Sequence, residues 1–140
     1  MKKASTRLIL RLVCLLGLTG MSSLCLAQEG HPLSGTWLGD WGTQESSQHF
    51  LTLIMEWDGT AISGQANPGP NTTSIGQITL HSADWSVSID MPMKDDNGTQ
   101  IQFKGQGKLE NLGAQTRTLN GTWEANGESG TFTLTRQSGA

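Results

Sequence analysis

The chain carries the sequence SGTW at residues 34–37 and the sequence FTLTR at residues 132–136, close to its C-terminus. In the second stretch Phe and Leu alternate with Thr, which predicts a half-buried final strand. The first stretch opens a predicted strand over about 34–41. A guanidinium over an indole face is attracted by the ring quadrupole. A contact between Trp37 and Arg136 would therefore be favourable, and it would bring the first and last strands together.

The sequence between these two stretches predicts β-structure throughout. It is rich in Gly, Ser and Thr, and short alternating runs are separated by turn residues every 8–12 positions. No ten-residue stretch has a convincing helical period. Asp58-Gly59 predicts a two-residue hairpin turn, and further turns are expected at 82–83, 94–98 and 125–128. The expected strands after 34–41 cover about 48–57, a segment through Ile62, 75–81, a segment with Trp85, Val87, Ile89 and Met91, a segment with Ile101 and Phe103 that continues to Leu109, 116–124 and 130–136.

These elements predict an all-β fold, a single antiparallel up-and-down β-barrel of about eight strands over residues 34–137. Each strand has one apolar face, which is enough to fill a small barrel. Closure would also remove the exposed edges that make a Thr-rich sheet prone to pair with neighbouring molecules. The alternative fold is an open sandwich of two sheets.

The first 27 residues have the pattern of a cleaved signal peptide. Basic residues precede an apolar stretch centred on residues 12–18, and Ala27 provides a small residue for cleavage. We expect a flexible segment at 28–33 and a periplasmic or secreted protein. Neither Cys14 nor Cys25 is preceded by a small residue, so no lipid anchor is expected.

Removing this leader changes the chemistry of the chain. Both cysteines lie in it, so disulfides and thiol catalysis are excluded from the remainder. The leader also contains four of the nine basic residues and none of the twelve acidic ones. The remainder is strongly acidic, which argues against nucleic acid and anionic membranes as partners.

A family resemblance rests on Gly35, Thr36 and Trp37 together with Arg136. These residues resemble the calycin superfamily, which includes lipocalins, fatty-acid-binding proteins and avidins. The whole pattern also resembles small secreted bacterial domains of unassigned role. The resemblance implies that Gly35, Trp37 and Arg136 are structural residues that close one end of the barrel. The chain has no Tyr, and the avidin-type biotin ligands do not map onto it.

The large residues that could line a pocket supply flat, apolar and polarisable surface, which suits ring or acyl ligands. An eight-stranded barrel can also be filled by its own side chains, so ordinary core positions are the alternative for each of them. The candidate ligand-binding residues are Trp41, Met55, Trp57, Trp85, Met91 and Trp123.

We expect a non-enzymatic binding protein that holds a small apolar or amphipathic ligand in the barrel interior. His31, His49 and His81 are dispersed and lack a metal-binding spacing, so no catalytic residue, metal or cofactor is predicted. The alternative function is a protein-binding module, such as a periplasmic protease inhibitor whose N-terminal segment enters the target cleft. A secreted protein would then be the partner.

Overall fold

A computed structural model describes residues 30–43, 48–95 and 97–138. Its elements confirm an all-β, antiparallel, up-and-down fold, and the part described contains strands and no helix. The expected leader lies outside the described residues. The strands are β1 (Gly35–Gly42), β2 (Gln48–Trp57), β3 (Ile62–Ala66), β4 (Thr73–Ser74), β5 (Gln77–His81), β6 (Ser86–Lys94), β7 (Gln100–Glu110), β8 (Thr118–Ala125) and β9 (Glu128–Arg136).

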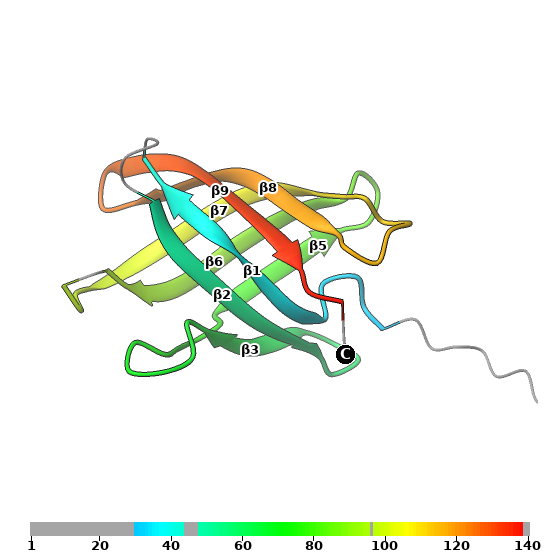
Figure 1. Cartoon of the computed structure of the whole chain (residues 1–140), viewed down its shortest axis with the longest axis horizontal. Helices are drawn as coiled ribbons and strands as arrows, with labels where there is room; N and C mark the ends of the chain where they lie inside the picture. Colours follow the sequence, from blue (N-terminus) through cyan, green and yellow to red (C-terminus); the bar gives the residue numbers. More distant parts are fainter. Residues whose placement is uncertain (1–29, 44–47, 96, 139–140) are drawn as a thin grey trace, which may run out of the picture.

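All nine strands belong to one continuous sheet in the order β4-β3-β2-β1-β9-β8-β7-β6-β5. The sandwich alternative is therefore wrong. Every strand pairs with the next strand in the sequence, except that β4 does not pair with β5. These two strands form the edges of the sheet. Pairing of β1 with β9 joins the two halves of the chain (Figure 1). The result is a strongly curled half-barrel.

The two edges of this curled sheet lie near each other. Residues 75 and 76 alone separate β4 from β5, so the chain passes directly from one edge to the other. Contacts of β3 with β5 and of β4 with β6 accompany this crossing. The sheet thus encloses an interior, although its two edge strands, β4 and β5, are not joined to each other by a ladder of hydrogen bonds.

The interior of the curled sheet is filled by the apolar faces of the strands. In β6, Val87, Ile89, Met91 and Met93 are buried in strict alternation with more exposed residues, as a strand with one solvated face requires. Phe103, Phe132 and Trp37 are the largest of the fully buried side chains. All buried residues of the described part are hydrophobic apart from glycine.

The turn at the last hairpin follows the prediction. Asn126 and Gly127 separate the paired residues Ala125 and Glu128. Both have positive φ, 50° and 82°, as a type I′ turn requires, and Asn-Gly is the preferred sequence for it.

Two other turns differ from the expectation. The β2–β3 turn is centred on Gly59 and Thr60, because the Asp58 amide donates to the Ala61 carbonyl. The Asp58 carboxylate accepts the Ala61 and Thr60 amides, and these hydrogen bonds lower its pKa. Trp85, expected on a strand, lies in the β5–β6 turn with φ 60°.

Candidate ligand-binding site

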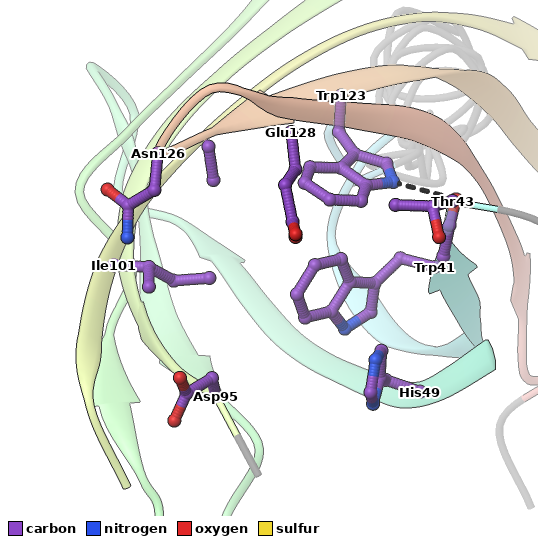
Figure 2. Close-up of a pocket in the computed structure, with 10 residues that line it drawn as sticks. Trp41, Thr43, His49, Asp95, Ile101, Trp123, Asn126 and Glu128 are labelled. Atoms are coloured by element: carbon purple, nitrogen blue, oxygen red, sulfur yellow. Dashed lines mark hydrogen bonds between the residues drawn. The ribbon is translucent and has the colours of Figure 1, made fainter. Parts of the chain in front are cut away.

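A cavity of about 430 Å³ opens at one end of the curled sheet. It lies where β1 ends and β2 begins, beside the β6–β7 and β8–β9 turns (Figure 2). In an up-and-down sheet, alternate turns gather at the same end, which brings these distant segments together. We call this cavity the mouth. Its lining residues are Trp41, Gly42, Thr43, His49, Asp95, Ile101, Trp123, Ala125, Asn126 and Glu128.

The apolar floor of the mouth is an aromatic cluster. The rings of Trp41 and Trp123 lie 4.7 Å apart at 83°, an edge-to-face arrangement. Phe103 lies beneath them, 5.6 Å from Trp41 and 5.9 Å from Trp123, and is completely buried. The Trp123 Nε1 donates a 3.2 Å hydrogen bond to the Gly42 carbonyl, which fixes this indole against β1. This hydrogen bond and the ring contacts set the orientation of the two indoles.

Polar side chains surround this floor. The His49 ring lies 5.0 Å from the Trp41 ring at 39°. The Glu128 carboxylate extends toward the two indoles from β9 (Figure 2). Asp95 Oδ1 accepts the amides of Asn97 and Thr99 at 2.9 and 2.8 Å, which holds the β6–β7 turn in shape. The mouth thus combines aromatic surface with two carboxylates, an imidazole and the amide of Asn126.

Two of the six candidate ligand-binding residues, Trp41 and Trp123, line the mouth. Met55 and Met91 are buried in the core, with 1% and no exposed surface. Trp57 is 41% exposed and stacks on His31 with ring centroids 4.4 Å apart. Trp85 packs against the edge of the core from its turn. The structure therefore brings two of the six together and disperses the other four.

Sequence reasoning did not select the polar residues of the mouth. His49 lacks a metal-binding spacing in the sequence. Asp95, Asn126 and Glu128 lie in the turns expected at 94–98 and 125–128. The signal that could have found them is the up-and-down order itself. It places those two turns and the start of β2 at one end of the sheet.

Over the ranges that the structure describes, no group of three His, Cys, Asp or Glu side chains is placed to hold a metal ion. In the part of the chain that the structure describes, no helix is long and apolar enough to cross a membrane.

The opposite end of the sheet contains the predicted closure residues. Trp37 is completely buried and lies opposite Arg136 in the β1–β9 ladder. The Arg136 Nε donates a 2.7 Å hydrogen bond to the Ser34 carbonyl. A Cβ atom added at Gly35 would come within 2.9 Å of this Nε, so the glycine leaves room for the guanidinium. Stacking of the guanidinium on the Trp37 ring stays a prediction.

The segment before β1 packs across this end. Residues 28 and 29 of the expected flexible segment lie outside the described residues, but Leu33 is completely buried. Its carbonyl accepts a 2.8 Å hydrogen bond from Trp37 Nε1. Arg117 Nη1 donates to the Pro32 carbonyl at 3.1 Å. The segment 31–34 is thus held by contacts with its own chain.

The fold and the mouth define a class of protein, a strongly curled up-and-down β-sheet with a preformed aromatic cavity at one end. Comparison with protein-family models, curated proteins and solved structures found no significant match. The functional argument therefore rests on the site itself.

Proposed function

We propose that the protein is a non-enzymatic binding protein that holds a small amphipathic molecule in the mouth. We further propose that it acts in the periplasm or outside the cell, after removal of the leader at residues 1–27. The observation that carries the binding proposal is the Trp41–Trp123 pair in a cavity of about 430 Å³. Small-molecule sites commonly have volumes of about 300–1,000 Å³, with aromatic walls and a few polar groups.

The packing of the interior supports the mouth rather than the middle of the sheet as the binding position. Phe103 and Phe132 lie 6.0 Å apart directly below the mouth, and both are buried. A ligand would therefore rest on Phe103 and the two indoles, with its polar end toward His49, Asn126 and Glu128. A compound with one or two rings fits this space.

Native mass spectrometry of the protein purified from its secretory compartment tests the proposal. We expect an excess mass that disappears on denaturation, and the released compound would identify the ligand. Trp41→Leu should lose this excess mass because it removes half of the indole pair. Trp57→Leu is the matched control, since this tryptophan is exposed and stacks on His31 away from the mouth. A bare mass for the wild type, or an excess that survives Trp41→Leu, would count against the mouth as the site.

A further inference from the structure

We propose that the mouth selects an organic cation, a primary or quaternary ammonium group carried on one aromatic ring or a short alkyl chain. This inference rests on the proposed function and specifies the ligand of the same site. It follows from the charges of the lining residues, from the carboxylate groups that remain available, and from the nature of the ring surfaces beside them.

The described lining of the mouth carries negative charges. Asp95 and Glu128 supply them, and the described lining contains no Lys or Arg to compensate. The part of the chain after the leader is acidic as well, with five basic and twelve acidic residues. A concave site lined by one sign of charge attracts ligands of the opposite sign. An anionic ligand would meet repulsion from both sides of the cavity.

The carboxylate of Glu128 is available for a ligand. Glu128 is exposed, and among the described residues its carboxylate has no hydrogen-bond or ion-pair partner. It extends toward Trp41 and Trp123 in Figure 2. Asp95 uses only Oδ1 to hold its turn, so its other oxygen and its charge also remain. An ammonium group in the mouth could therefore pair with a carboxylate while its carbon atoms lie on the indoles.

The ring surfaces favour the same ligand. Trp is the side chain whose face attracts cations most strongly. Trp41 and Trp123 pack edge to face at 83°, and 6% and 4% of their surfaces are exposed. A compact ammonium group needs only this small indole surface at the floor of the cavity. An uncharged ring would use the same apolar surface but would gain no attraction from the Glu128 carboxylate.

Three probes of nearly equal size test the charge preference, namely 3-phenylpropylammonium, 3-phenylpropan-1-ol and 3-phenylpropanoate. Binding is followed by the indole Nε1–H resonances in 15N-HSQC spectra, with Trp41→Phe and Trp123→Phe used for assignment. We expect the ammonium compound to shift both resonances and to bind about tenfold more tightly than the alcohol. The carboxylate should bind most weakly.

Two isosteric variants locate the effect. Glu128→Gln and Asp95→Asn should each weaken ammonium binding by about three- to tenfold and weaken alcohol binding by clearly less, so that the ratio of the two affinities falls. Asn at position 95 retains the oxygen that accepts the turn amides, so the fold is preserved. Glu124→Gln is the control, because Glu124 is exposed on β8 and lies outside the mouth lining. It should change neither affinity.

The outcomes separate this inference from the function on which it rests. Equal affinities for the ammonium compound and the alcohol would overturn the charge preference and leave a binding mouth. An equal loss of ammonium and alcohol binding in Glu128→Gln would show that the effect does not depend on charge, and would also overturn the preference. If none of the three probes shifts either indole resonance, both the cation site and the proposed binding function fail.

Discussion

Trp37 on β1 and Arg136 on β9 occupy directly opposed positions in the ladder that joins the first strand to the last. Paired residues on antiparallel strands point to the same face, and Trp37 is completely buried, so Arg136 is directed inward as well. Its Nε reaches back to the Ser34 carbonyl. One side chain thus ties the end of the chain to the segment that precedes the first strand.

Arg136 is therefore expected to contribute strongly to stability. Arg136→Ala should lower the free energy of unfolding by about 2 kcal/mol, because it removes a charge-assisted hydrogen bond and leaves the Ser34 carbonyl without this donor. Arg136→Lys should recover little, since Lys has no donor at the Nε position. Chemical denaturation measures both variants. Lys104→Ala, on the exposed face of β7, is the control, and an equal loss there would remove the special role of Arg136.

Arg117, by contrast, would be a poor surface control. It is half-buried, it donates to the Pro32 carbonyl, and its Nε is buried without a hydrogen-bond partner. Substitution there would disturb the same end of the sheet as Arg136→Ala.

Gly39 should be needed for the pairing of β1 with β9. A Cβ atom at this position would overlap the Thr133 carbonyl oxygen on β9. Gly39→Ala must therefore push the two strands apart or bend one of them, at a cost of about 1–3 kcal/mol. Gly113→Ala is the matched control, because an added Cβ there meets no atom within 4 Å. Thermal unfolding should separate the two variants, and equal melting temperatures would contradict the close approach.

The strands were largely predictable because one face of each is buried. The expected strand at about 48–57 matches β2, and its buried Leu51, Leu53 and Met55 alternate as the pattern requires. The prediction failed where a local conformation depends on tertiary contacts. Trp85 extends the alternation of β6 in the sequence, yet its backbone turns back with positive φ, and its carbonyl accepts the Leu109 amide. A period-two pattern carries no information about such a contact.

The candidate site was predictable only in part, for a related reason. Residue size and type selected Trp41 and Trp123, but the same criteria also selected Trp57. Trp57 is exposed at the end of β2, where it stacks on His31 outside the mouth. Glu128 and Asp95 give no distinctive signal in the sequence, since acidic residues near turns are usually solvated. Only the placement of two turns over one aromatic floor makes them part of a cavity.

His31 should make the end of the sheet opposite the mouth sensitive to acid. Burial lowers the pKa of this imidazole below its usual 6.5, and its Nδ1 accepts the Leu33 amide at 3.3 Å, which requires the unprotonated nitrogen. The unfolded chain therefore binds the proton more readily, and the contribution of His31 to stability is lost as the pH falls through 6.5 toward the folded value. His31→Phe keeps a ring to stack on Trp57 but cannot titrate. Denaturation at pH 8, 7, 6 and 5 should show the wild type losing stability relative to His31→Phe over the acidic part of this range. A constant difference between the two proteins, or a relative gain by the wild type in acid, would show that His31 is not held in its neutral form.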